Sequence, residues 1–467
     1  MLRFRRSIAA SLGAALVLTC HVEARANQAA ASSPKIVPSR EFLPFARSAQ
    51  SAWNEARKRS EVQARKAELD VLFQQKTAAA PLKPGSPEAA RFEAKRAELL
   101  GLLSAERAAI ENLQSSAVSN DDRFFAGNMV IEFGGFTRDN GLLRRGLELA
   151  LASGLVAPDK RPRFNFALGQ IDYDNKDLLS ARVRFKELMG AGFFENDIDF
   201  YLAESYFTES PDKNVLEGLK VLLFYSERAK AQGKSLSLQA MRRGLAQSYK
   251  IHDSLLASYF GAEAARLEPN RKNWAAAVAV LRISLEAEGA DRQVMVDLAR
   301  LADRTAGFWE ARDYLESVRV YTAAALPQEL LGAVQTGTAA GLLKATDPLV
   351  SSAQQWARQQ LAKDQASNAL ELANRDARKA SARTATIVSA GSLALSYGRP
   401  DLAEELYRIA QARPDANADL VNTRLGIAQF DLGRFAEAQA SFARVTGGGA
   451  PLARLWAVHA ANRQKGL

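Results

Sequence analysis

The sequence predicts an all-α protein in which antiparallel helical hairpins stack into a solenoid. Three observations support this fold class. Alternating runs of Val, Ile and Thr between turn residues, which are typical of strands, are absent. The composition, 47% hydrophobic and 24% charged, is that of a soluble helical protein. Residues 390–445 contain two copies of one hairpin at a constant offset of 35 positions, matching Gly391 with Gly426, Gly398 with Gly433, Ala403 with Ala438 and Tyr407 with Phe442.

Each matched position has a mechanical role in such a hairpin. Gly426 lies in the first helix and Ala438 in the second, and small side chains allow two helices to approach to about 8–10 Å. Gly433 ends the first helix, where a left-handed residue is needed and glycine adopts that conformation freely. Phe442 projects from the second helix as the large residue that packs between repeats.

This pattern resembles the tetratricopeptide (TPR) repeat family. In the last copy the matching residues are Leu425, Gly426, Gly433, Phe435, Ala438 and Phe442, while Val445 stands where the family usually has alanine. A third match covers residues 163–188, through Leu168, Gly169, Tyr173, Ala181, Phe185 and Leu188. Lys176 occupies the turn of that copy, where the family has glycine. The resemblance implies a TPR-like α-solenoid.

Further copies of the repeat are less regular. Leu202 and Ala203 repeat Leu168 and Gly169 at an offset of 34, but the second helix of that copy begins late, after residues 210–212. Fainter copies cover residues 245–269 and 298–315, and Gly307 is expected at the turn of the second. We therefore assign residues 120–325 to TPR-like repeats and residues 385–467 to a C-terminal repeat pair with a capping helix, which covers the exposed end of the stack.

Residues 1–26 have the features of an export signal. Arg3, Arg5 and Arg6 precede an apolar run from Ile8 to Leu18, and an A-x-A cleavage pattern ends at Ala26. We expect cleavage after Ala26 and a periplasmic location. An uncleaved anchor and a lipoprotein acylated at Cys20 are the alternatives. Because Cys20 is the only cysteine, the mature chain would have no disulfide and no thiolate metal site.

Residues 27–43 are rich in Ala, Ser and Pro, and we expect a flexible leader. Residues 44–119 predict two long helices, 46–76 and 87–115, that form a helical hairpin with coiled-coil character. The apolar stripe of the second helix contains Leu99, Leu103, Ile110 and Leu113. The hairpin closes either on itself or on a second chain, and the latter would make a homo-oligomer. Residues 326–384 predict an elbow with a long polar helix over 351–375.

The residues that usually carry catalysis or bind cofactors and metals do not form a recognisable site. Gly233 to Ser235 resembles the end of a phosphate-binding loop, but Arg228 stands where the first glycine is required. Asp172, Asp174 and Asp177 lack the glycine and distal acid of a calcium loop, so we interpret them as helix-capping residues. His252 and His459 are far apart in sequence. We therefore predict no enzyme, no cofactor and no metal site.

The TPR resemblance implies a groove along the inward face of the first helix of each pair. In that register the groove is lined by aromatic residues and by charges of both signs, which suits recognition of a protein. The residues that we expect to bind a partner are Arg163, Phe166, Gln170, Tyr173, Asp174, Asp197, Phe200, Glu204 and Phe207.

These features predict a periplasmic scaffold that holds envelope proteins or peptides. The alternatives are an accessory subunit of a polysaccharide export or outer-membrane assembly machine and, less favoured, an enzyme acting on cell-wall glycan. The signal holds four arginines and one glutamate, so the mature chain keeps a formal charge of about +7. With no nucleic-acid-binding motif, this excess predicts weak association with an anionic envelope surface and no nucleic-acid partner.

Overall fold

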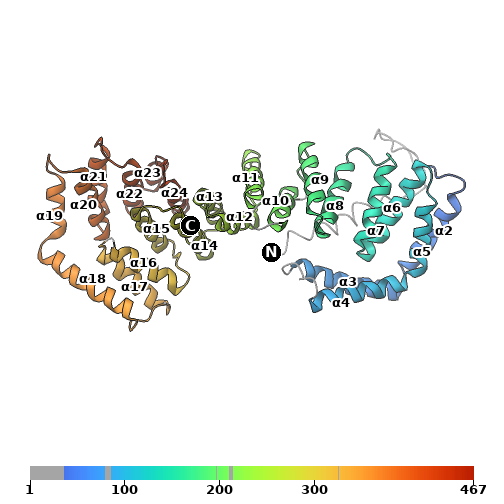
Figure 1. Cartoon of the computed structure of the whole chain (residues 1–467), viewed down its shortest axis with the longest axis horizontal. Helices are drawn as coiled ribbons and strands as arrows, with labels where there is room; N and C mark the ends of the chain where they lie inside the picture. Colours follow the sequence, from blue (N-terminus) through green and yellow to red (C-terminus); the bar gives the residue numbers. More distant parts are fainter. Residues whose placement is uncertain (1–35, 79–85, 196, 210–213, 324) are drawn as a thin grey trace. The chain divides into compact units, whose positions relative to one another are not determined.

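The fold is an all-α helical repeat solenoid, seen in a computed structural model that describes residues 36–78, 86–195, 197–209, 214–323 and 325–467. Over these residues the chain forms 23 helices and no strand (Figure 1). They belong to two compact units, which we call the N-terminal unit (up to Glu209) and the C-terminal unit (from Ser210). The division falls inside segment 120–325, for which the sequence predicts one run of repeats.

The N-terminal unit contains nine of the helices. They are α2 (Leu43–Ala56), α3 (Ser60–Ala78), α4 (Pro87–Leu102), α5 (Ser104–Ser115), α6 (Asn120–Thr137), α7 (Asn140–Ala152), α8 (Arg161–Asp174), α9 (Leu178–Gly190) and α10 (Ile198–Glu209). Helices α6 and α7, and then α8 and α9, pack as antiparallel hairpins. The predicted signal, residues 1–26, lies outside the described residues. None of the described helices in either unit combines the length and the apolar character needed to cross a bilayer.

Each arm of the expected N-terminal hairpin is broken into two helices. The first arm is interrupted after Ala56 and the second at Leu103, so that α3 packs on α4 and α2 packs on α5. All four residues of the predicted apolar stripe are at most 1% exposed. Trp53 of α2 packs edge-on against Phe133 and Phe136 of α6, with ring centroids 5.2 and 5.0 Å apart. The hairpin therefore closes on itself and on α6, and its stripe is used within the chain.

The last residues of the predicted flexible leader are held in place. Ser39 donates hydrogen bonds from its backbone nitrogen (2.8 Å) and its hydroxyl (2.9 Å) to the carboxylate of Asp122. Asp122 also completes a capping box with Ser119 at the start of α6. Phe42 is 1% exposed. The expectation of a flexible leader is therefore wrong for residues 39–43, because a buried carboxylate and an aromatic residue anchor them. Residues 27–35 lie outside the described part.

The C-terminal unit contains the other fourteen helices. They are α11 (Val215–Ala231), α12 (Leu238–Ile251), α13 (Ser254–Leu267), α14 (Arg271–Ala287), α15 (Arg292–Arg304), α16 (Ala311–Ala323), α17 (Pro327–Ala339), α18 (Pro348–Ala366), α19 (Ala369–Ala377), α20 (Thr384–Ser396), α21 (Pro400–Gln411), α22 (Ala418–Asp431), α23 (Phe435–Phe442) and α24 (Ala450–Gln464). The single polar helix expected over 351–375 is two helices, because Asn368 adopts a left-handed conformation (φ 49°) between α18 and α19.

The chain of the C-terminal unit turns back on itself. After α18 and α19, the hairpins α20–α21 and α22–α23 return along the earlier helices, and α24 packs on both α23 and α13 (Figure 1). Asn462 of α24 donates a hydrogen bond to the carbonyl of Ala265 in α13 (3.2 Å). The expected capping helix, α24, does cover α23. It is not the exposed end of the stack, however. Its other side is buried against a helix nearly 200 residues earlier.

A local signal sets the turn inside several hairpins. In three of them a residue in the left-handed conformation is followed by an aspartate whose side chain caps the second helix: Arg138–Asp139, Lys176–Asp177 and His252–Asp253. Lys176 thus takes the conformation for which the repeat usually has glycine. The expectation for Gly307 is wrong by one position, because Ala306 is the residue with positive φ (50°) at that turn.

Four hairpins share one packing contact between a glycine of the first helix and an aromatic ring sixteen residues later. The pairs are Gly169–Phe185, Gly244–Phe260, Gly391–Tyr407 and Gly426–Phe442. A methyl group added at any of these glycines would come closer than 3.0 Å to the ring. The aromatic residue therefore packs against the glycine of its own hairpin, and this contact fixes how closely the two helices approach.

Replacing one of these glycines tests the contact. We expect Gly426→Ala to lower the free energy of unfolding by about 1–3 kcal/mol, because the added methyl overlaps a ring that is only 2% exposed. Gly448→Ala is the matched control, since nothing lies within 4 Å of the added methyl there. The measurement is chemical denaturation followed by circular dichroism. Equal midpoints for the two variants would show that the ring moves aside at no cost.

Candidate functional site in helices α8 and α10

The predicted partner-binding residues lie in and around helices α8 and α10 of the N-terminal unit. Helix α8 begins with Pro162 in its first turn, where the missing N–H leaves no intrahelical hydrogen bond unmade. Asp177 caps the following helix, α9, by accepting a hydrogen bond from the backbone nitrogen of Ser180 (3.2 Å). The contact between Gly169 and Phe185 then fixes α8 against α9. These local features position the inward face of α8.

The nine predicted residues divide into three classes by exposure. Phe166, Gln170 and Phe207 are at least nine-tenths buried. Tyr173, Phe200 and Glu204 are partly buried, and Arg163, Asp174 and Asp197 are exposed. The groove assignment is therefore wrong for the two buried phenylalanines as partner contacts, because their rings belong to the interior of the unit. The six accessible residues and Gln170 remain candidates.

An aromatic cluster connects the two helices. The ring centroid of Phe166 lies 5.8 Å from that of Phe185, 5.9 Å from that of Phe193 and 5.7 Å from that of Tyr201 in α10. Tyr201 also packs edge-on against Tyr173, with centroids 5.9 Å apart. Tyr201 is not among the residues predicted from the sequence, although it is partly exposed and lies between the two predicted positions Asp197 and Glu204. Its spacing of four and three residues from them was the signal that could have identified it.

Gln170 is the chemically distinctive residue of this face. It is 8% exposed, and its side-chain nitrogen Nε2 has no hydrogen-bond partner. It lies one turn from Phe166 and one turn from Tyr173 on the stripe of α8 that contacts Tyr201. A buried amide without an acceptor costs about 1–3 kcal/mol. A bound ligand that supplies a carbonyl or carboxylate oxygen would remove that cost.

The aspartates near the end of α8 have structural partners. Asp172 is buried and ion-paired with Arg144 and with Arg184, the latter at 2.8 Å. Asp177 caps α9, as predicted, whereas the capping interpretation is wrong for Asp172, because its carboxylate lies within α8 and forms these ion pairs. No group of three or more His, Cys, Asp or Glu side chains with the geometry of a metal site occurs among the residues that the structure describes.

The same face of the C-terminal repeat pair is already occupied. Counting from the glycine that contacts the aromatic ring, Ser392 and Ser396 of α20 correspond to Gln170 and Asp174. Ser396 donates a hydrogen bond to Glu329 of α17. Asp431 of α22, in the corresponding position of the last hairpin, forms a bidentate ion pair with Arg304 of α15, at 2.6 and 2.7 Å. Helices α15 and α17 thus fill the groove of helices α20 and α22.

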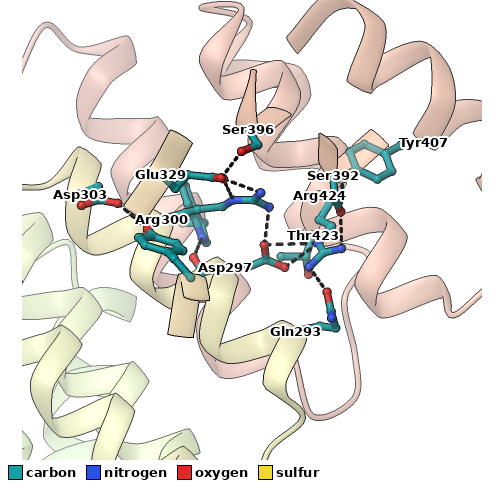
Figure 2. A network of polar contacts seen from close by, with 12 residues as sticks. Gln293, Asp297, Arg300, Asp303, Glu329, Ser392, Ser396, Tyr407, Thr423 and Arg424 are labelled. Carbon is teal, nitrogen blue, oxygen red and sulfur yellow. Dashed lines mark hydrogen bonds and ion pairs between the residues drawn. The ribbon is translucent and has the colours of Figure 1, made fainter. Parts of the chain in front are cut away.

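A network of buried charges joins these four helices (Figure 2). Asp297 of α15 lies at its centre. Its carboxylate oxygens are 3.0 Å from a guanidinium nitrogen of Arg300 and 3.1 Å from one of Arg424 in α22. Arg300 also pairs with Glu329 at 2.6 Å, and Arg424 donates to Ser392 at 2.6 Å. Asp297, Arg300 and Arg424 are at most 2% exposed. Two carboxylates thus balance two guanidinium groups, which is the condition for burying them.

His459 of α24 lies in an aromatic enclosure near this network. Its ring stacks on Phe430 at 4.7 Å and meets Trp274 edge-on at 5.4 Å, and it is 6% exposed. Burial, together with the positive charges of Arg463 and Arg304, lowers the pKa of His459 to about 4. Protonation of this imidazole is therefore unfavourable in the folded state.

This lowered pKa makes stability depend on pH. Above the pKa of about 6.5 in the unfolded chain, His459 is neutral in both states. Below it, the unfolded state binds a proton that the folded state does not, so stability falls as pH drops toward 4. We expect the His459 contribution at pH 5 to be about 2 kcal/mol less favourable than at pH 7.5. Urea unfolding of the wild type and of His459→Phe at both pH values measures it. An equal pH effect in the two proteins would contradict the assignment.

No model of a protein family matches the chain, and no curated protein matches it in sequence. The fold and the contacts of the candidate residues are therefore the basis for any functional conclusion.

Proposed function

We propose that this protein is a periplasmic scaffold built from TPR-like repeats, which holds a partner protein in the groove of α8 and α10 in the N-terminal unit. The export signal predicted for residues 1–26 supports the location, and the hairpins with their glycine–aromatic contacts support the resemblance to TPR repeats. A chain of stacked hairpins presents an extended surface that suits protein recognition.

One observation carries the choice of groove. Gln170 is nine-tenths buried in the groove of α8, and its Nε2 has no acceptor. In the C-terminal repeat pair, by contrast, the corresponding Ser392 and Ser396 have partners on or beside α15 and α17. The chain fills one groove with its own helices and leaves a buried donor unsatisfied in the other. A partner is the source of the missing acceptor.

Site-specific photo-crosslinking in intact cells tests this function. A photoreactive residue placed at Tyr173 or Phe200 reports contacts in the groove, and one placed at Glu187, exposed on α9, is the matched control. We expect a discrete crosslinked partner from the groove positions alone. We also expect Gln170→Leu, which keeps the volume of the side chain and removes its donor, to reduce the yield of that product.

Two outcomes would contradict the proposal. The first is a partner captured as well from Glu187 as from the groove. The second is a groove product whose yield is unchanged by Gln170→Leu. The identity of a captured protein also separates a scaffold for envelope growth or constriction from an accessory subunit of an export or outer-membrane assembly machine.

A further inference from the structure

A partly buried arginine of α24 lies against α13 with only neutral acceptors. Arg454 donates hydrogen bonds from Nη1 to the backbone carbonyl of Leu255 (3.0 Å) and to the hydroxyl of Ser258 (2.8 Å). Within the part of the chain that the structure describes, Arg454 forms no ion pair, and its Nε and Nη2 atoms make no hydrogen bond. Neither nitrogen is fully buried. One edge of the guanidinium group is therefore open to a ligand from solvent.

Tyr259 of α13 brings a second cation close to Arg454. The guanidinium carbon of Arg454 lies 5.9 Å from the ring centroid of Tyr259, and the Nζ atom of Lys230 in α11 lies 4.9 Å from it. Lys230 also donates to the hydroxyl of Tyr259 (3.3 Å), which shares a hydrogen bond with Ser226 of α11 (2.6 Å). Two positive charges from different helices are thus held against one ring, each in a cation–π contact.

One carboxylate is shared among three cations of this surface. Glu263 lies one turn after Tyr259 on α13, and it accepts from Lys230 (2.6 Å). It also accepts from Nε of Arg266 (2.9 Å). Burial lowers the pKa of Arg454 in spite of the negative charge of Glu263, so the charge of this arginine is incompletely compensated. The three cations and Glu263, which we call the α13 cation cluster, have a net charge of +2.

The helices around the α13 cation cluster are basic as well. Residues 215–287, which span α11 to α14, contain eleven lysines and arginines against six aspartates and glutamates. Residues 450–467, which include α24, contain three against none. Such an excess produces a positive field that concentrates anions at the surface. An anion that docks at Arg454 therefore gains a local contact and a favourable long-range field.

We propose that the α13 cation cluster binds a phosphate group, which contacts the open edge of Arg454 and the ammonium group of Lys230. The fork formed by Nε and Nη2 of a guanidinium group fits two oxygens of a phosphate. A phosphate monoester carries a charge of about −1.5 to −2 at pH 7, which matches the excess of the cluster, whereas a carboxylate balances about half of it. This inference does not depend on the groove of α8 and α10. It is also more specific than the weak association with an anionic surface that the net charge predicts.

Isothermal titration calorimetry with inorganic phosphate and with acetate, at equal ionic strength, tests the site on the mature full chain. We expect one saturable phosphate site and at least about tenfold weaker binding of acetate, because acetate carries less charge. Equal affinity for the two anions would overturn the assignment to phosphate.

Two variants of α24 locate the binding. Arg454→Gln should weaken phosphate binding at least about tenfold, because it removes both the charge and the fork. Arg463→Gln removes the same charge from the other side of α24, nine residues later, at an exposed position. This matched control should change the affinity less than about twofold, since solvent screens an exposed charge at that distance. An equal loss in both variants would show that phosphate responds only to the net charge of the chain.

A variant of α11 provides a second test, because Arg454 also helps to hold α24 on α13. Lys230→Gln changes an exposed side chain, and we expect about two- to fivefold weaker phosphate binding. Lys234→Gln, in the turn after α11, is its matched control. Thermal unfolding followed by circular dichroism shows whether each variant is folded. Unchanged affinity in a folded Lys230→Gln variant would overturn the assignment of Lys230.

Vesicles distinguish the two sources of such a phosphate group, a lipid headgroup and a soluble phosphate. Phosphatidylcholine vesicles with and without phosphatidic acid, a phosphomonoester lipid, are sedimented with the wild type and with Arg454→Gln. Binding that requires phosphatidic acid and is lost in Arg454→Gln indicates a lipid headgroup. Arg454-dependent binding of inorganic phosphate without vesicle binding indicates a soluble ligand. If Arg454→Gln changes neither assay, the inference is overturned, while the proposed function of the α8 and α10 groove is unaffected.

Discussion

Replacing Asp297 by alanine is expected to lower the free energy of unfolding of the C-terminal unit by about 3–5 kcal/mol. Asp297 is 1% exposed and is the carboxylate to which both Arg300 and Arg424 are paired. Without it Arg424 keeps only neutral partners, Ser392 and Gln293, in a site from which water is excluded. Leaving a buried guanidinium without a counter-charge destabilises the folded state far more than replacing both members of an ion pair by apolar residues. Chemical denaturation of the full chain measures the loss.

A double variant separates charge balance from packing. Asp297→Leu with Arg424→Met removes one charge of each sign and fills the space with apolar groups, so we expect it to recover most of the stability lost in Asp297→Ala. Arg300 and Glu329 remain paired in that protein. If the double variant were as unstable as the single one, the hydrogen bonds of the network, and not its charge balance, would hold α15 to α22.

Replacing Trp456 by alanine is expected to cost about 3–5 kcal/mol and to loosen helices far from it in sequence. Trp456 is fully buried, stacks on Phe442 with centroids 5.8 Å apart, and donates from Nε1 to the backbone carbonyl of Asp297 (3.2 Å). Hydrogen exchange should therefore accelerate in α13 and α15 as well as in α22–α24. In an open solenoid the change would fade within the neighbouring repeats.

Trp309→Ala is the control for this experiment. That side chain is 52% exposed and lies under Arg271, whose guanidinium carbon is 5.2 Å from the ring centroid. We expect it to cost less than about 1 kcal/mol, the size of an exposed cation–π contact. If Trp456→Ala accelerated exchange in α22–α24 alone, the contact of α24 with α13 would not couple the two ends of the unit.

The sequence predicted the repeat because the repeat is local. Gly426 and Phe442 are sixteen residues apart, and the short turn at Gly433 brings them together once α22 and α23 form. The left-handed turn at Lys176 could also be located, since the residues on either side define it. The packing of α22 on α15 was not predicted, because Asp297 and Arg424 are 127 residues apart and resemble any other charged residues on a helix.

The sequence predicted which helices carry the candidate residues, but not how deeply each side chain is buried. The register correctly places Tyr173, Gln170 and Glu204 on helices α8 and α10, which contact each other through Tyr201. It does not indicate that Phe166 is buried, because the residues that cover its ring, Phe193 and Tyr201, come from the next connection and the next helix. Burial depends on tertiary neighbours, and a single-helix pattern does not contain them.

The return of α24 also limits how this protein can change in evolution. Open repeat arrays lengthen and shorten by duplication or loss of a hairpin, because each hairpin contacts only its neighbours. Here one extra hairpin between α20 and α23 would carry Trp456 away from Asp297 and Asn462 away from Ala265. The number of hairpins from α13 to α24 is therefore fixed by closure. This part of the chain can therefore evolve by substitutions within its existing helices, but not by duplication of a hairpin.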